Sequence, residues 1–359
     1  MVSVIIACYN DHYWLHHTVE RLYKGQDINS FEVIIVDDCS DVAVSQLDFI
    51  YKVTDTTYLP VRTLRNRVHQ GVGYCFDRGV KSSVGDTIVL MGSDVLVRGR
   101  SWLLETNLAA KTYPNSIGAA VSYCFSPENQ DFEDKEVKKT YGAEIRWIMG
   151  GWKKQINVEG AASDYVLDIV SAASINDEEV VKKWNYTVPC LIGAFYVTTK
   201  EFYLRINGWD TDGGLNKGHQ HWGGLEPWIS IKAWMAGGEV RVIPNLHVGH
   251  IYGRLTHAGG VMAQRGIRAD LRWYNKLFIA HTLFTEYEKQ GLLKMVESLY
   301  KKNTAYDKNY GIAKKLIQQN KEWVETVMRR NDELAVTERG YRNLDLFKQK
   351  FGIGLPWMM

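Results

Sequence analysis

Long hydrophobic runs are missing from this 359-residue sequence, although 45% of its residues are hydrophobic. No apolar stretch approaches the roughly 20 residues that a transmembrane helix needs. The apolar segment at residues 2–7 has the pattern of a buried strand and not that of a signal peptide. We therefore expect no stable membrane insertion and a cytoplasmic location.

Cysteine is scarce, and its five positions are an odd number and widely spaced. No two cysteines form a C-x-x-C motif, which argues against zinc or redox chemistry. The sequence therefore predicts buried free thiols at Cys8, Cys39, Cys75, Cys124 and Cys190.

Neither sign of charge dominates the whole chain, whose formal net charge is +2. From Arg265 to the C-terminus, 18 Lys and Arg face 11 Asp and Glu, so this part carries +7, whereas the preceding residues carry −5 with 25 against 30. A basic segment beside an acidic body could face a polyanion. A solvated helical surface rich in lysine is the alternative explanation.

Strand and helix patterns alternate over the first third of the chain. Apolar and β-branched runs predict strands at residues 2–7, 31–36, 58–66, 86–95 and 117–125, and apolar residues at helical spacing predict helices at 12–25 and 73–84. This order is typical of an open α/β sheet, in which ligands bind at the carboxyl ends of the strands.

The pattern weakens between residues 126 and 187, which we interpret as an acceptor-side insertion. Order returns with a predicted helix at 226–238, which ends on two glycines, and a strand at 239–244. From about residue 263 the chain is mostly helical. We expect an α/β domain at residues 1–262 and a basic helical extension at residues 263–359.

Polar residues follow three of the predicted strands. Tyr9 follows the first strand, Asp38 the second, and Ser93 with Asp94 the fourth. Each of these could be an ordinary turn residue, because Asp, Asn and Ser favour turns. They acquire meaning only in combination with a later block, residues 208–254, which is dense in aromatic, glycine, acidic and histidine residues.

In combination, these segments resemble known glycosyltransferases. "VSVIIACYN", "EVIIVDDCS" and "GVKSSVGDTIVLMGSD" are similar to the nucleotide-binding half of family 2 glycosyltransferases with the GT-A fold. "NGWDTDG…HWGGLEPWISIKAWMAGGEVRVIPNLHVGHIYGR" resembles polypeptide N-acetylgalactosaminyltransferases and chondroitin-type polymerases, and "AQRGIRADLRWYNKLF" resembles the helix that follows the metal histidine in the former. The resemblance implies a GT-A (Rossmann-like) fold with a C-terminal helical extension, and a nucleotide-diphosphate sugar as donor.

The resemblance also implies a metal site. Family members use Asp-x-Asp or Asp-x-His with a later His, and these positions fall on Gly92, Asp94 and His250, so the first ligand is absent. One carboxylate and one imidazole, completed by diphosphate oxygens and water, suit Mn²⁺ (or Mg²⁺) better than Ca²⁺. Because two protein ligands make a weak site, we expect metal and donor to bind together.

Donor-binding roles follow from the same comparison. Tyr9 and Asp38 fall on positions that contact the base and ribose, and a carboxylate can accept from the pyrimidine N3–H, which favours a UDP-sugar. Ser93 and Trp222 are further donor-site candidates, and Arg254 is expected to close over the diphosphate.

Glu226 is the predicted catalytic base, because it stands where inverting relatives carry the Asp of "WGG-Glu-Asp". Partial desolvation would raise its pKa toward the useful range. A structural Glu that complements the dipole of a helix N-terminus is the alternative. Asp210 is a second catalytic candidate, although it could instead shape the acceptor loop. His219 and His221 could be a metal pair, or part of a flexible lid.

Two acceptor classes remain open. One is a hydroxymethylpyrimidine in phage-type DNA, which the basic extension and its aromatic residues favour through phosphate contacts and base stacking. The other is a saccharide or lipid-linked glycan precursor in the cytoplasm. An inactive module that binds a sugar nucleotide or a glycan is the alternative from another class, since one metal ligand is missing.

Overall fold

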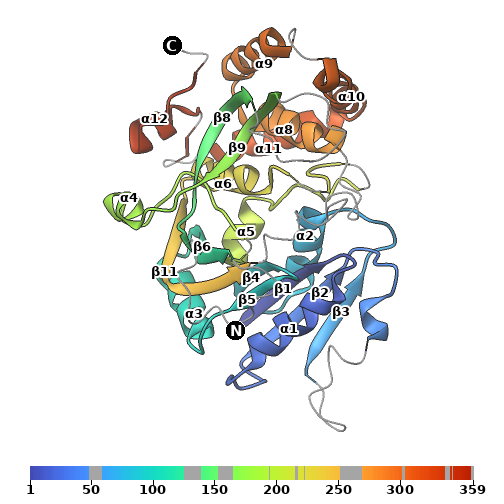
Figure 1. Cartoon of the computed structure of the whole chain (residues 1–359), viewed down its shortest axis with the longest axis vertical. Coiled ribbons are helices and arrows are strands. Elements are labelled where there is room, and N and C mark those ends of the chain that lie inside the picture. Colours follow the sequence, from blue (N-terminus) through green and yellow to red (C-terminus); the bar gives the residue numbers. More distant parts are fainter. Residues whose placement is uncertain are drawn as a thin grey trace.

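The computed structural model describes residues 1–47, 59–124, 139–152, 165–193, 195–214, 217–221, 223–250, 269–300, 304–335, 340–341 and 343–356. Their elements divide between a body built on a sheet and a helical end, at the bottom and the top of the molecule in Figure 1.

The body contains a large mixed sheet. Its strands are β1 (Val2–Cys8), β2 (Phe31–Asp37), β3 (Val61–Arg65), β4 (Thr87–Gly92), β5 (Val95–Val97), β6 (Ser116–Cys124), β7 (Lys139–Thr140), β10 (Phe195–Thr199) and β11 (Glu239–His250). Their order is β3-β2-β1-β4-β10-β6-β11-β5, with β7 beside β6. β1 to β4 run parallel, whereas β10 is antiparallel to both of its neighbours. The carboxyl ends of β1, β2 and β4 therefore meet at one edge.

Helices cover both faces of the sheet. One face carries α1 (His12–Tyr23) and α3 (Trp102–Thr112), and the other carries α2 (Val72–Ser82), α5 (Lys200–Arg205) and α6 (Leu225–Met235), while the short η1 (Val44–Gln46) follows β2. Successive side chains of a strand point to opposite faces. In β1, Val4 and Ile6 accordingly join the core of α1 and α3, and Ile5 and Ala7 join the core of α2 and α6.

Residues 126–187, the predicted insertion, contain a hairpin that stands apart from the main sheet. β8 (Ala143–Trp152) and β9 (Tyr165–Ser174) pair antiparallel, and α4 (Glu178–Lys183) follows them. The hairpin runs toward the helical end (Figure 1), where the Trp147 ring contacts Phe284 and Phe347 at centroid distances of 5.9 and 5.4 Å. Residues 125–138 and 153–164 lie outside the described part of this segment.

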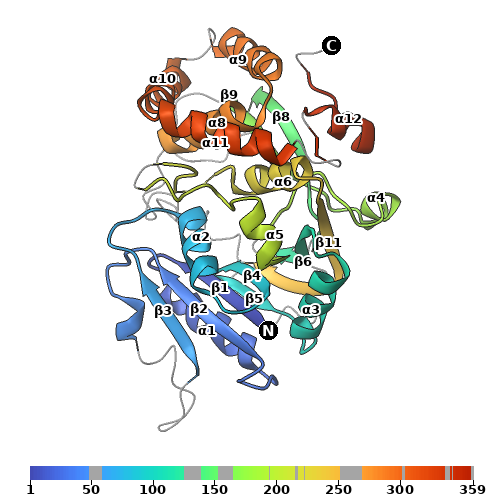
Figure 2. The same ribbon diagram turned by 180° about the vertical axis from the view of Figure 1, so that it is seen from behind.

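The C-terminal part is helical, as predicted. It contains α8 (Ala269–Leu283), α9 (Glu286–Tyr300), α10 (Thr304–Gln319), α11 (Lys321–Ala335) and α12 (Asp345–Phe351). α8 and α11 lie above α6 in Figure 2, and Phe278 of α8 stacks on Trp228 of α6 at a centroid distance of 4.9 Å. Both rings belong to one hydrophobic core that reaches from β1 to α12. The predicted boundary after residue 262 therefore does not separate two cores.

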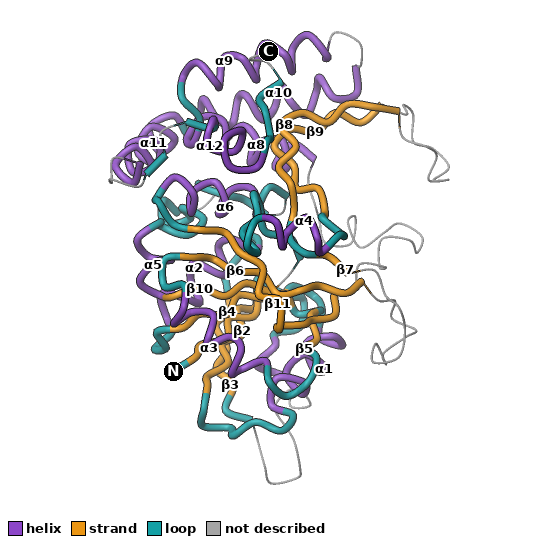
Figure 3. Tube along the Cα trace, turned by 90° about the vertical axis from the view of Figure 1, so that its left-hand side faces the viewer, coloured by secondary structure: helices purple, strands orange, loops and turns teal. Residues whose placement is uncertain are grey.

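β11 is longer than the predicted strand, which ends at Pro244. Its pairing with β6 shifts between Ile243 and His247, so residues 244–246 form a bulge, where a proline without an N–H is tolerated. Beyond the bulge β11 pairs antiparallel with β5, and His250 lies opposite Val95. Figure 3 shows β11 within the body, below α6 and the helical end.

Two expectations from composition can be compared with the described residues. Among them, no helix combines the length and the apolar composition that crossing a membrane requires. Cys8, Cys75 and Cys190 are buried free thiols, as predicted, whereas Cys39 is partly exposed.

Candidate active site

The ends of three neighbouring strands bring the N-terminal candidates to one edge of the sheet. Cys8 pairs with Asp37, and Ala7 pairs with Gly92, so the residues that follow β1, β2 and β4 lie side by side. Tyr9, Asp38 and the Ser93–Asp94 pair are these residues.

Asp94 and His250 meet although 156 positions separate them. The pairing of β5 with β11 places His250 Nε2 3.6 Å from Asp94 Oδ1, and Asp94 is 7% exposed. Two donors that share one octahedral ion at about 2.1 Å lie about 3 Å apart, so a small movement would let both bind one divalent cation. This mixed oxygen and nitrogen set fits Mn²⁺.

Gly92 stands at the position of the absent metal ligand and leaves space for the Asp94 carboxylate. A Cβ at position 92 would lie 2.8 Å from Asp94 Oδ1, closer than such contacts allow. The glycine therefore leaves room for the observed direction of the Asp94 carboxylate. A side chain at position 92 would displace that carboxylate.

Ser93 bonds Asp11 and Thr18 at the start of the chain. Its hydroxyl donates to Asp11 Oδ2 over 2.8 Å, its carbonyl accepts from the Thr18 hydroxyl over 2.8 Å, and the residue is 5% exposed. Ser93 is thus committed to α1, and its hydroxyl holds the turn that presents Asp94. Donor binding by Ser93 stays a prediction.

Glu226 lies in the first turn of α6, after Gly224, whose φ is 78°. Its Oε1 lies 3.2 Å from the Tyr196 hydroxyl. Burial raises the pKa of Glu226, and the Tyr196 hydroxyl, the Lys276 ammonium and the His250 imidazole oppose this increase. Glu226 is therefore close enough to His250 for the two side chains to interact electrostatically.

Asp38 organises the loop between β3 and α2. Its Oδ1 accepts from the Asn66 side chain at 2.7 Å and from the Gln70 N–H at 2.9 Å, and its Oδ2 accepts from the Gly71 N–H at 2.6 Å. Burial raises the pKa of Asp38 despite these bonds. A uracil that bonds Asp38 would therefore share a carboxylate that already accepts these three hydrogen bonds.

His69 is a site residue that the sequence reasoning missed. Its ring stacks on Tyr9 at 4.0 Å with an interplanar angle of 17°, and its Nε2 lies 3.3 Å from Asp38 Oδ2. The His221 ring meets it edge-on at 4.6 Å. A single histidine in "NRVHQG" carries no local signal for this position. His69 contacts both side chains that the resemblance assigns to the nucleoside.

Gly71 makes this arrangement possible. Its φ is 102°, and a Cβ there would lie 2.2 Å from the His221 Cα. Residues 71 and 221 form an isolated parallel bridge, and the His221 N–H donates to the Gln70 carbonyl over 3.0 Å. The loop that carries His69 is therefore joined to the loop that precedes Glu226.

Asp210 does not face the site. It is 1% exposed and bonds the equally buried Lys232, with Arg330 Nη1 3.9 Å from its Oδ1. Burial raises the pKa of Asp210 to about 7, and the Lys232 ammonium opposes this increase. This enclosure favours the structural alternative for Asp210, and its catalytic role stays a prediction.

Three further candidates complete the comparison with the sequence. Trp222 and Arg254 lie outside the described residues. His219 is 2% exposed, its Nε2 lies 2.9 Å from the Gly223 carbonyl, and burial lowers its pKa to about 3. The His219 Nε2 faces a carbonyl, and the His221 ring faces His69. Both histidines are therefore arranged to support the loop and not to bind a metal as a pair.

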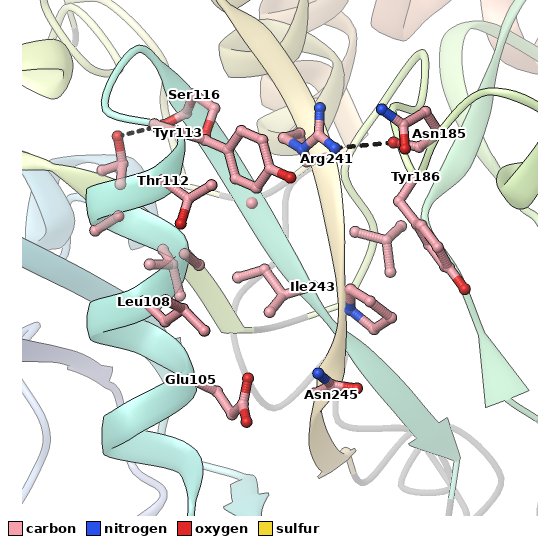
Figure 4. Close-up of a pocket in the computed structure, with 17 residues that line it drawn as sticks. Glu105, Leu108, Thr112, Tyr113, Ser116, Asn185, Tyr186, Arg241, Ile243 and Asn245 are labelled. Atoms are coloured by element: carbon pink, nitrogen blue, oxygen red, sulfur yellow. Dashed lines mark hydrogen bonds between the residues drawn. The ribbon is translucent and has the colours of Figure 1, made fainter.

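A cavity of about 270 Å³ lies at the other end of the sheet (Figure 4). Tyr113, Ser116 and Arg241 are among its lining residues. Ser116 is the first residue of β6, whereas His250 pairs with Cys124 at the last residue of the same strand. The Arg241 guanidinium is stacked on Tyr113 and donates to the Asn185 carbonyl over 2.8 Å. This cavity is separate from the Asp94–His250 edge.

Comparisons with known proteins agree with the geometry. Residues 3–165 match the family described as Glycosyl transferase family 2. The chain is 22% identical over 298 residues to polypeptide N-acetylgalactosaminyltransferase 11 of Xenopus tropicalis, covering 81% of this chain and 44% of that protein. It is 23% identical over 263 residues to a Macaca fascicularis protein described as inactive polypeptide N-acetylgalactosaminyltransferase-like protein 5, covering 73% and 52%. The chain spans about half the length of these relatives.

The crystal structure of GalNAc-T7 with UDP, GalNAc and Mn²⁺ superposes with a TM-score of 0.57 at 16% identity, over 91% of this chain and 57% of that one. This likeness confirms the predicted α/β architecture of the GT-A type, with its helical C-terminal part.

Proposed function

We propose that this chain, which carries a glycosyl transferase family 2 domain on a GT-A fold, is a metal-dependent glycosyltransferase that moves a sugar from a UDP-sugar to an acceptor hydroxyl. The observation that carries the proposal is the approach of His250 to Asp94 at the carboxyl edge of the sheet, with Glu226 close enough for the charge of His250 to affect its pKa. The similarity to N-acetylgalactosaminyltransferases favours an N-acetylhexosamine or a hexose as the transferred sugar.

Asp94 and His250 would hold the cation, Mn²⁺ or Mg²⁺, through one carboxylate oxygen and one imidazole nitrogen. A divalent cation bound there neutralises the charge that develops on the leaving diphosphate. Tyr9 lies at the same edge and offers a ring on which the uracil can stack.

Glu226 is the proposed general base. It takes the proton of the acceptor hydroxyl while the acceptor oxygen forms a bond to the anomeric carbon and the bond from that carbon to the diphosphate breaks, which releases UDP. Its raised pKa suits this task, because a base is most effective when its pKa lies near the working pH.

Glu226→Gln tests this role. We expect transfer to fall by about a hundredfold or more, the usual contribution of a positioned base, while UDP binding persists. Glu178→Gln is a matched control, since the Glu178 carboxylate also bonds tyrosine hydroxyls but lies on α4. Near-normal turnover of Glu226→Gln would remove Glu226 from the mechanism.

For the acceptor, we propose a hydroxymethylpyrimidine in DNA, held through phosphate contacts. The +7 charge from Arg265 onward supports this. Three aromatic residues of this part, Trp273, Tyr274 and Tyr310, are 6%, 0% and 2% exposed and pack the helices, so they are not available to stack on bases. A saccharide hydroxyl is the alternative acceptor, consistent with the family 2 domain.

Intact mass of a short hydroxymethylpyrimidine duplex, after incubation with the protein, Mn²⁺ and a pool of UDP-sugars, tests acceptor and donor together. We expect a gain of one sugar on the modified strand and none on an unmodified duplex. UDP release without this gain would leave the saccharide alternative. No UDP release at all would favour the inactive binding module.

A further inference from the structure

Helix α8 of the C-terminal part bonds directly to the loop that carries the proposed base. Asn275 is fully buried, and its side-chain amide bonds backbone groups of this loop. The Gln220 N–H donates to Asn275 Oδ1 over 2.8 Å, and Asn275 Nδ2 donates to the Gln220 and Gly223 carbonyls over 2.6 and 2.9 Å. One side chain thus fixes backbone groups on both sides of the turn before Glu226.

The loop needs such support because its backbone is strained. His221, a residue with a Cβ, has a φ of 46°, and Gly223 and Gly224 have φ values of 98° and 78°. The left-handed conformation of His221 persists only when the surroundings hold it, whereas the two glycines adopt positive φ without strain. α6 begins immediately afterwards, at Leu225. The direction in which α6 presents Glu226 therefore depends on how this turn is held.

Lys276 extends the contact to the other side of the loop. Its Nζ donates to the Val170 carbonyl over 2.8 Å and to the Ser171 hydroxyl over 3.1 Å, and the residue is 3% exposed. Its Cδ would lie 3.6 Å from a Cβ at Gly224. Val170 has a φ of 47°, which is rare for a β-branched residue. Adjacent residues of α8 thus secure both the loop and the β8–β9 hairpin.

From these contacts we propose that Asn275 is a positioning residue for the transfer reaction, acting through the Gln220–Gly224 turn on Glu226. The helical C-terminal part is then a component of the active site and not an appendage to it. This inference rests on the proposed function, since it gives Asn275 its role through the proposed base. The donor side has a support of its own besides the bridge between Gly71 and His221, because Asp38 bonds the Gln70 and Gly71 N–H groups without α8.

Asn275→Ala tests the proposal against Asn331→Ala. Asn331 is also a buried asparagine of the helical part, 1% exposed, and its Nδ2 donates to the Thr282 carbonyl at the far end of α8 over 3.2 Å. We expect Asn275→Ala to lower kcat for transfer by about tenfold to a hundredfold, the size of effect that a misplacement of about 1 Å produces, with unchanged KM for the donor and unchanged Kd for UDP. Asn331→Ala should leave all three values unchanged at a comparable loss of thermal stability.

The outcomes separate the inference from the proposed function. An active wild type in which Asn275→Ala and Asn331→Ala behave alike overturns the inference alone, as does a loss confined to donor KM. A wild type that releases no UDP with any acceptor overturns the proposed function and the inference with it. If Asn275→Ala does not fold, Asn275→Asp replaces it, because it keeps the shape and the bond from the Gln220 N–H but cannot donate to the two carbonyls. The same fall in kcat is then expected.

Discussion

Replacing Lys232 by Met should destabilise the protein strongly and in a way that depends on pH. Lys232 and Asp210 are both fully buried and bonded to each other, and Lys232 Nζ also donates to the Gly208 carbonyl over 3.0 Å. Removal of Lys232 leaves the buried Asp210 carboxylate with the more distant Arg330, and we expect a cost near the lower end of the range of about 3–5 kcal/mol for a buried charge that loses its partner. Methionine fills most of the lysine volume, so the loss should reflect the charge more than a cavity.

The pH dependence follows from the pKa of Asp210. Burial raises it to about 7 and Lys232 opposes this, so the pKa must rise further without Lys232. A carboxyl group with a raised folded-state pKa contributes stability that is complete below its unfolded pKa and is lost as the pH rises through the folded value. In the wild type, the contribution of Asp210 to stability no longer varies with pH above about pH 7. The Lys232→Met variant, in contrast, still gains stability as the pH falls from about 9 to about 7. The difference in the free energy of unfolding between wild type and Lys232→Met should therefore narrow by up to about 1.4 kcal/mol for each pH unit of this fall.

Urea denaturation of wild type and Lys232→Met at about pH 9 and about pH 7 measures this difference. The double variant Asp210→Asn with Lys232→Met should recover much of the loss, because neither buried charge remains. Asp210→Asn alone should retain measurable transfer, unlike Glu226→Gln, if Asp210 is structural. An equal difference at both pH values would refute the electrostatic explanation, and complete loss of transfer in a folded Asp210→Asn would restore the catalytic alternative.

Two further predictions concern the donor site. Asp94→Asn should abolish the Mn²⁺-dependent part of UDP binding in calorimetry while leaving the urea midpoint unchanged, and metal-dependent binding that survives would place the cation elsewhere. His69→Ala should tighten UDP binding severalfold, because the base would no longer displace a ring from Tyr9 and a nitrogen from Asp38; weaker binding would mean instead that His69 stacks on the base.

The sequence predicts the N-terminal half of the fold well because its signals are local. The β-branched run of β1 and the apolar spacing of α1 and α2 need only neighbouring residues to be read. The end of β11 shows the limit. Pro244 marks a plausible stop, yet the strand continues through a bulge because β5 offers a partner beyond it. That bulge brings His250 to Asp94, and only the resemblance to glycosyltransferases predicts their meeting.

The site shows the same division between local and distant causes. Asp210 and Glu226 are both carboxylates within one aromatic, glycine-rich block, and nothing near either residue in the sequence distinguishes them. Their surroundings in the fold distinguish them. Asp210 forms a buried ion pair with Lys232 of α6, whereas Glu226 lies beside Tyr196 and near His250. A role for a carboxylate thus depends on which distant cation or hydroxyl the fold places beside it.

The helical C-terminal part is a further case in which the fold decides the role of charged and polar residues. By composition it is a basic surface, and its +7 charge says nothing about which cations reach solvent. In the fold, Lys276 is 3% exposed and bonds the β9 backbone, while Asn275 bonds the loop before Glu226. A truncation before α8 would therefore remove the supports of the proposed base together with the charge. For this reason single substitutions at Asn275 and Asn331, and not deletion of the helices, can distinguish a positioning role from a DNA-binding one.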